Sequence, residues 1–72
     1  MSLLTQAYLL EKYGPRLDIE QLSEVLGLAA GTIYNQISAG EFAVPTYVHG
    51  KKRWADARDV AEAFDEFRKQ AA

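Results

Sequence analysis

The side chains with the clearest binding chemistry stand in two short stretches, one uncharged and one basic. The uncharged stretch covers residues 30–38 and contains hydroxyl, phenol and carboxamide groups, which form hydrogen bonds with base edges. The basic stretch covers residues 49–53, and its Lys and Arg side chains neutralise phosphates. A ligand that offers both phosphates and polar edges is a nucleic acid. The candidate contact residues are Gly31, Thr32, Tyr34, Asn35 and Ser38 in the uncharged stretch, and His49, Gly50, Lys51, Lys52 and Arg53 in the basic stretch.

The uncharged stretch is predicted to form a helix over residues 30–38. Ile33 and Ile37 lie four residues apart, so they stack on one face of that helix and point into the protein. The candidate contacts then fall on the opposite side and its flank, where they form a small, polar and uncharged surface. Gly40 follows this helix and can supply the left-handed residue that ends it.

A partner helix is predicted just before it, over residues 19–26. Asp18 is a candidate N-cap, and Gln21 stands three residues later as the partner in a capping box. Gly27 ends this helix and begins a short turn into the next one. Two short helices joined in this way are typical of a helix-turn-helix, whose second helix enters the major groove of DNA.

The basic stretch is predicted to be the tip of a β-hairpin over residues 45–55. His49-Gly50-Lys51 is a tight-turn signal between two β-rich segments. A hairpin with a basic tip after a recognition helix is a wing, which lies along the DNA backbone or enters a minor groove. Because an isolated hairpin is marginally stable in water, this one must pack on the helices. Its candidate anchors are Phe42, Val44, Tyr47 and Trp54, with Trp54 expected in the core.

An additional helix is predicted at the N-terminal end, over residues 3–13. Its apolar side chains cover more than one stripe, and two hypotheses follow. Either a small core uses all of this apolar surface, or part of the helix meets another copy of the protein. The apolar positions at helical spacing are Leu3, Ala7, Leu10 and the pair Leu4 and Tyr8, and Leu9 widens the surface.

The last helix is predicted over residues 57–69, with Asp56 as its N-cap. Arg58 has two equal interpretations, because it can pair with Glu62 four residues on or reach a phosphate. The predicted apolar stripe of this helix consists of Val60, Ala61, Phe64 and Phe67.

Length and composition limit the classes of protein that this chain can be. Residues 1–72 make one domain at most, with a modest core. There is no cysteine and a single histidine, so neither a disulfide nor a metal site is expected. No nucleophile–base pair or Gly-rich phosphate loop can be named, so neither an enzyme nor a cofactor is expected. No apolar run approaches a membrane span, and a cytoplasmic, nucleoid-associated protein is the expectation.

The charge distribution allows local binding of phosphates although the net charge of the chain is −2. Residues 43–58 contain four basic side chains and one acidic side chain, which gives +3. The other 56 residues therefore carry −5. An acidic body with one basic protrusion can bind a polyanion at the protrusion.

The ordered combination of these elements resembles the small winged helix-turn-helix proteins of the phage excisionase and MerR-like group. The shared features are Thr32-Ile33-Tyr34, Gly40, the hairpin from Pro45 to Arg53 and the Asp-led helix from Asp56 to Phe64. The resemblance covers about 70% of the chain, from Leu17 to Phe67. The helix over residues 3–13 lies outside this pattern. It is similar to that of small prophage regulators, including pyocin activators and the excisionases of integrated filamentous phages.

The resemblance implies a mainly α-helical fold with a small β-hairpin, which binds double-stranded DNA. It also implies an excisionase that binds repeated sites cooperatively as an oligomer, bends DNA, assists a phage integrase and regulates nearby promoters. Thr32, Tyr34 and Asn35 match recognition-helix positions that contact DNA, and residues 51–53 match wing positions. One departure is that the recognition helix has no Arg or Lys. Base reading would then depend on Asn35 at adenine and on DNA shape.

Other functions of the same sequence stay open. The chain can be a small activator or repressor of prophage or plasmid genes, including a toxin–antitoxin or plasmid-partition regulator. It can also be a protein–protein adaptor, in which the helix-turn-helix is only a scaffold. The apolar first helix would then bind a partner such as an integrase or an RNA polymerase subunit.

Overall fold

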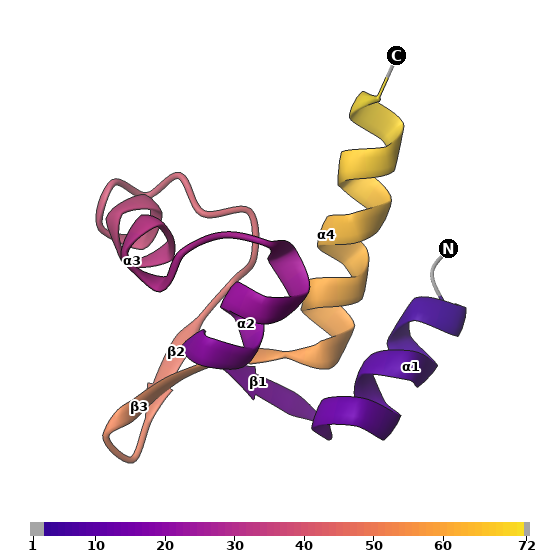
Figure 1. Cartoon of the computed structure of the whole chain (residues 1–72), viewed down its shortest axis with the longest axis horizontal. Helices are drawn as coiled ribbons and strands as arrows, with labels where there is room; N and C mark the ends of the chain where they lie inside the picture. Colours follow the sequence, from indigo (N-terminus) through magenta and orange to yellow (C-terminus); the bar gives the residue numbers. More distant parts are fainter. Residues whose placement is uncertain (1–2, 72) are drawn as a thin grey trace.

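The computed structural model describes residues 3–71, which form four helices and a small three-stranded antiparallel sheet (Figure 1). All four predicted helices and the predicted hairpin are present, so the mainly helical fold class with a small β element is confirmed. The last helix ends one residue later than predicted. The elements in chain order are α1 (Leu3–Tyr13), β1 (Arg16–Asp18), α2 (Ile19–Leu26), α3 (Ala30–Ser38), β2 (Tyr47–His49), β3 (Lys52–Asp56) and α4 (Ala57–Gln70).

The pair α2 and α3 is fixed by local hydrogen bonds, as the sequence predicts. The Gln21 backbone N–H donates to Asp18 Oδ1 at 2.9 Å, and the Asp18 N–H donates to Gln21 Oε1 at 3.1 Å. This reciprocal capping box satisfies two amide groups at the start of α2. Gly27 ends α2 with a left-handed φ of 71°, and Ser23 Oγ donates to the Leu28 carbonyl within the turn. The arrangement is compatible with a winged helix-turn-helix.

The sheet contains a strand that the sequence does not reveal. Residues 16–17 are predicted only as an extended link, but Arg16–Asp18 is strand β1, which pairs antiparallel with β3. The strand order is β1-β3-β2, so β3 lies between the other two. Leu17 stands opposite Ala55, and both side chains are fully buried under the helices. The third strand thus secures the hairpin to the body of the protein.

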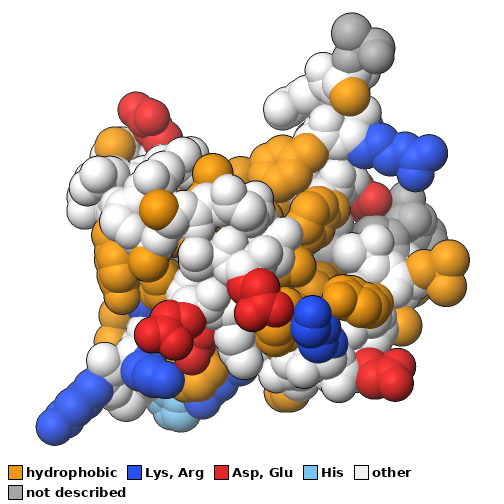
Figure 2. Space-filling model, viewed as in Figure 1, with side chains coloured by type: hydrophobic (Ala, Val, Ile, Leu, Met, Phe, Trp, Pro, Cys, Tyr) orange, Lys and Arg blue, Asp and Glu red, His pale blue; other side chains and the backbone are white. Residues whose placement is uncertain are grey.

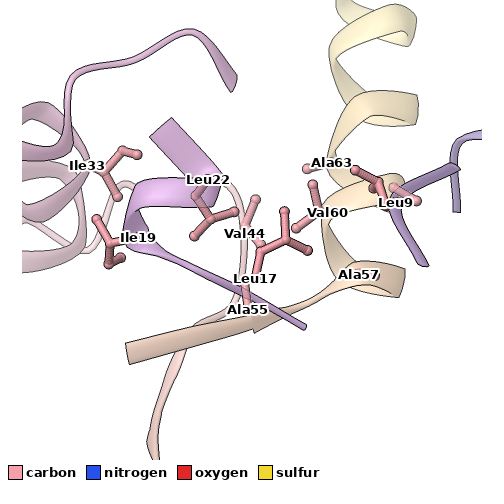
Figure 3. Packing of buried hydrophobic residues seen from close by; sticks show 11 residues of the cluster. Leu9, Leu17, Ile19, Leu22, Ile33, Val44, Ala55, Ala57, Val60 and Ala63 are labelled. Carbon is pink, nitrogen blue, oxygen red and sulfur yellow. The ribbon is translucent and has the colours of Figure 1, made fainter. Parts of the chain in front are cut away.

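A single core joins the sheet to α2, α3 and α4 (Figure 3). Leu22 of α2 and Ile33 of α3 are fully buried, and Val60 of α4 lies near Leu17. Small side chains of α4 are also buried, which lets this helix pack closely on its neighbours. The buried residues are Leu9, Leu17, Ile19, Leu22, Ile33, Val44, Ala55, Ala57, Val60, Ala61 and Ala63.

The hypothesis that the core uses all the apolar surface of α1 is wrong. Leu9 is the buried residue of this helix, and Tyr13 packs partly against the core. Helix α1 packs mainly on α4 and β1, and Tyr13 and Lys12 in its last turn contact Glu24 of α2, whereas its remaining sides face solvent. The predicted apolar positions lie on those sides: Leu3, Leu4, Ala7, Tyr8 and Leu10 are all exposed.

Three other predictions of side-chain environment are corrected. Asp56 occupies the N-cap of α4, but its side chain makes no capping hydrogen bond and accepts instead from the Tyr47 hydroxyl at 2.9 Å. Trp54 is only half-buried, because it lies on the outer face of the sheet. Phe67 is exposed because the end of α4 extends past the rest of the molecule (Figure 1). Among the described helices, none has the length and apolar character that crossing a membrane requires.

Candidate nucleic-acid interface

Helix α3 presents the predicted uncharged surface to solvent. Gly31, Thr32, Tyr34, Asn35 and Ser38 are all exposed, and the Tyr34 side chain is 52% exposed. The opposite side of the helix is held by Ile33, which is fully buried, and by Ile37, which packs against the core. The two isoleucines therefore orient the five candidate contacts outward, as the four-residue spacing predicts.

The hairpin ends in a two-residue turn that projects one lysine. His49 pairs with Lys52 across the hairpin, which leaves Gly50 and Lys51 as the turn. Gly50 has φ of 69°, and among the described residues every positive φ belongs to a glycine. A positive φ at the first turn position matches a type II′ turn, which follows the twist of the strands. Lys51 is thereby exposed at the end of a short protrusion.

The uncharged surface and the basic hairpin line one open cleft. Tyr34 is the residue of α3 that lines it, residues 51–53 line it from the hairpin, and Asp18, Ile19 and Glu20 line it where β1 leads into α2. In Figure 1, α3 and the hairpin both lie on the left side of the molecule. Figure 2 shows Lys and Arg side chains gathered over the hairpin, with acidic side chains beside them. Tyr34 and residues 51–53, which are at least 17 residues apart in sequence (51 − 34), are thus neighbours in space.

An acidic residue of the cleft holds one of the lysines. Lys52 Nζ lies 3.3 Å from Asp18 Oδ2, in an ion pair between hairpin and helix. The Gln21 backbone N–H is the main reason that the pKa of Asp18 is lowered, and Lys52 lowers it further. A phosphate in the cleft must therefore compete with Asp18 for Lys52.

The other two basic residues of the hairpin, Arg53 and Lys51, differ in how many partners their side chains have within the protein. Arg53 is half-buried, and its guanidinium donates to Thr46 Oγ1 at 2.9 Å. Within residues 3–71, Lys51 has neither an ion pair nor a side-chain hydrogen bond. Lys51 is consequently the residue of the predicted triplet that is freest to meet a phosphate.

The outer face of the sheet holds a cationic residue that the sequence does not single out. The Arg16 guanidinium lies 4.0 Å above the Trp54 ring and donates to His49 Nδ1 at 2.9 Å. The Trp54 indole N–H in turn donates to the His49 carbonyl at 3.1 Å. Arg16 is thus held beside the hairpin although 33 residues separate it from His49. Finding it requires the pairing of β1 with β3, which no local signal in the sequence predicts.

Arg58 does not join the cleft. It is exposed at the start of α4 and lines a separate hollow with Gln6, Leu10, Pro15 and Asp56. The ion pairs of the described residues do not include one between Arg58 and Glu62. The predicted intrahelical pair is therefore wrong, and a phosphate contact by Arg58 stays a prediction.

We expect the capping box to make stability depend on acidic pH. Because the folded state lowers the pKa of Asp18, this residue stabilises the fold above the unfolded pKa, and the contribution is lost as the pH falls through the folded pKa. Asp18→Asn retains a capping side chain but removes the charge, so it should cost roughly 1 kcal/mol at pH 7. Urea unfolding at pH 7 and near pH 3 measures this difference, which should be smaller at the lower pH. Asp56→Asn, at an N-cap without a capping hydrogen bond, should cost less stability at pH 7 than Asp18→Asn.

Two glycines of the interface should respond oppositely to alanine. A Cβ would meet no atom within 4 Å at either Gly31 or Gly50, so only backbone conformation decides. Gly50→Ala forces an L side chain into a left-handed conformation and should cost about 1–2 kcal/mol. Gly31→Ala adds a better helix former to α3 and should add up to about 1 kcal/mol. Thermal unfolding followed by circular dichroism measures the change in stability for both variants. Destabilisation by Gly31→Ala would contradict the prediction that helix propensity controls this position.

Comparison of the chain with protein-family models, with curated proteins and with solved structures gave no match. The described part of the chain contains no group of three or more His, Cys, Asp or Glu side chains that could hold a metal ion.

Proposed function

We propose that this chain is a sequence-specific double-stranded DNA-binding protein, with residues 1–72 forming a single winged helix-turn-helix domain plus an added N-terminal helix. In this proposal α3 enters the major groove and the β2–β3 hairpin is the wing. One observation carries it: Tyr34, on the exposed uncharged face of α3, lines the same cleft as the basic residues 51–53 of the hairpin. A duplex offers base edges and phosphates side by side, and it can therefore contact both.

The two surfaces divide the work of binding. Lys51 supplies affinity through phosphate contact, and Lys52 joins it when phosphate displaces Asp18. Base reading falls to Thr32, Tyr34 and Asn35, with Asn35 suited to the N6 and N7 edge of adenine. Since α3 carries no basic side chain, one copy reads few base pairs. Strong binding then requires several copies on one DNA.

We further propose that the protein acts as an excisionase, also called a recombination directionality factor. Several copies on repeated sites would bend the duplex and assist a phage integrase, and the same binding would regulate phage promoters. This role accords with the weak single-copy reading expected of an uncharged recognition helix, and with the resemblance of Leu17–Phe67 to phage excisionases. It places the protein in the cytoplasm on the nucleoid. The alternative is a small transcriptional regulator without a role in excision. Its proposed contacts with DNA would be the same as those of the excisionase.

A selection experiment tests the DNA-binding proposal. Duplexes with a random central region are incubated with the protein, retained, amplified and sequenced, and the affinity for the selected site is measured by fluorescence anisotropy. We expect an enriched motif with adenine steps and a loss of discrimination of about 1–3 kcal/mol in Asn35→Ala. Gln70→Ala, which removes an exposed carboxamide at the end of α4 and away from the cleft, is the matched control. Retention without any enriched motif would overturn sequence-specific binding.

A protein–protein adaptor is the second candidate, because α1 leaves large apolar side chains exposed. Leu4 is 89% exposed and Leu3 is 67% exposed, a feature that often marks a protein contact. Under the adaptor hypothesis, the wild-type protein would not retain DNA, and neutralising Lys51 and Lys52 would leave partner binding intact. Under the DNA-binding proposal, the same change removes salt-sensitive DNA retention.

A further inference from the structure

Helix α1 carries two apolar sides, and only one of them is used inside the chain. Leu9 is buried and Tyr13 packs against the core, whereas Leu3, Ala7 and Leu10 form a stripe on the exposed side. Positions three and four apart lie together on a helix surface, so this stripe is continuous over two turns. The exposed Leu4 and Tyr8 extend it on one flank. Contiguous exposed apolar surface of this kind marks an interaction site.

We propose that this stripe is the interface with a second copy of the chain, in which the two α1 helices pack antiparallel and cross at Ala7. Along the stripe a large side chain, a small one and a large one follow each other, so its side-chain sizes are symmetric about Ala7. A two-fold interface requires such a self-complementary surface, because every contact between two different residues occurs twice and only a residue on the axis meets its own counterpart. The small Ala7 allows the helices to approach closely, and Leu3 and Leu4 of one copy then lie against Leu10 of the other.

Charge supports the antiparallel arrangement. The first turn of α1 contains no acidic residue, although the positive end of a helix favours one. In the proposed dimer, Glu11 of each copy lies beside the first turn of the other α1. Within residues 3–71, Glu11 takes part in no ion pair, so its carboxylate is available for that role. A parallel pair would instead bring the two Glu11 carboxylates together.

The proposed dimer has a consequence for DNA. The molecule measures 30 × 29 × 17 Å, and α3 and the hairpin lie on one side of it whereas α1 lies on the other (Figure 1). Pairing through α1 therefore turns the two clefts away from each other. Such a dimer would hold two separate duplex segments rather than two adjacent sites on one straight segment. This bridging function rests on the proposed DNA binding, whereas the dimer itself does not.

Sedimentation velocity over a range of concentrations tests the dimer. The wild-type protein should reach twice its monomer mass of 8.0 kDa. Ala7→Lys should weaken the association at least about tenfold, because it places a bulky charge at the crossing point. Val48→Lys, at an apolar position that is 61% exposed on the hairpin, should dimerise like the wild type. A wild type that stays monomeric, or equal loss in both variants, would overturn the proposal.

A single introduced thiol tests the geometry. The chain has no cysteine, so Ala7→Cys is its only site of disulfide formation. Mild oxidation should link Ala7→Cys into a covalent dimer, since two Cα atoms at a close crossing come within disulfide range. Glu62→Cys, exposed on α4, should remain largely monomeric. Equal linkage of the two variants would exclude an interface centred on Ala7.

Capture of a second duplex tests bridging. A duplex carrying the selected site is immobilised, the protein is added, and retention of a second labelled duplex is measured. Wild type should capture the labelled duplex, and Ala7→Lys should bind the immobilised duplex but lose most of the capture. Binding without capture by the wild type would overturn bridging and leave the DNA-binding proposal standing. Absence of binding would overturn the proposed function, and the dimer would still be judged by sedimentation and cross-linking.

Discussion

Replacing Lys51 and Lys52 together by Ala should lower the affinity for duplex DNA on the order of 100-fold at low salt. Both side chains are exposed and line the cleft with Tyr34, so two phosphate contacts are lost without disturbing the core. Each contact releases counterions, so the slope of log affinity against log salt should become shallower by about two. Fluorescence anisotropy on one labelled duplex over a series of salt concentrations measures both quantities.

The control for this prediction removes the same charge elsewhere. Arg68→Ala with Lys69→Ala deletes two exposed cations near the end of α4, away from the cleft, and should leave the salt slope unchanged. Asp18→Asn should act in the opposite direction, because it releases Lys52 and removes a negative charge from the cleft. It would therefore bind DNA more tightly although the folded state is less stable at pH 7. An equal effect of the α4 and hairpin changes would mean that net charge, rather than this cleft, drives binding.

Ile33→Ala should remove most of the stability of the folded protein. Ile33 is fully buried between α3 and α2, and its truncation leaves a cavity that costs about 2–5 kcal/mol. A single core in a chain this short supplies about 3–5 kcal/mol in total. Urea unfolding followed by circular dichroism should therefore show a transition at much lower urea, with a large unfolded fraction before urea is added.

The neighbouring isoleucine provides the comparison. Ile37 lies on the same side of α3 but is only partly buried, so Ile37→Ala should cost clearly less than Ile33→Ala. Equal costs at the two positions would show that α3 is held by something other than the side chain of Ile33. Because the DNA contacts of the proposal lie on the opposite face of α3, loss of this anchor should also weaken DNA binding.

The helices, the caps and the hairpin turn can be predicted from the sequence because local interactions control them. The capping box of Asp18 and Gln21, the left-handed Gly27 and the spacing of Ile33 and Ile37 involve residues within one or two turns of each other. The helices and the turn of the hairpin follow from such contacts, and their predicted bounds agree closely with the structure. The outward direction of Tyr34 and Asn35 also follows, because one buried side of a helix fixes the other.

The way in which those elements pack on one another depends on contacts between residues that are far apart in the sequence. Arg16–Asp18 is a strand because β3 pairs with it, and Arg16 reaches Trp54 and His49 only through that pairing. Helix α1 has apolar residues all round, so periodicity could not tell which side α4 would cover, and the side with Leu9 is the buried one. A residue's environment at such positions depends on a partner surface far away in the sequence. No local pattern carries that information.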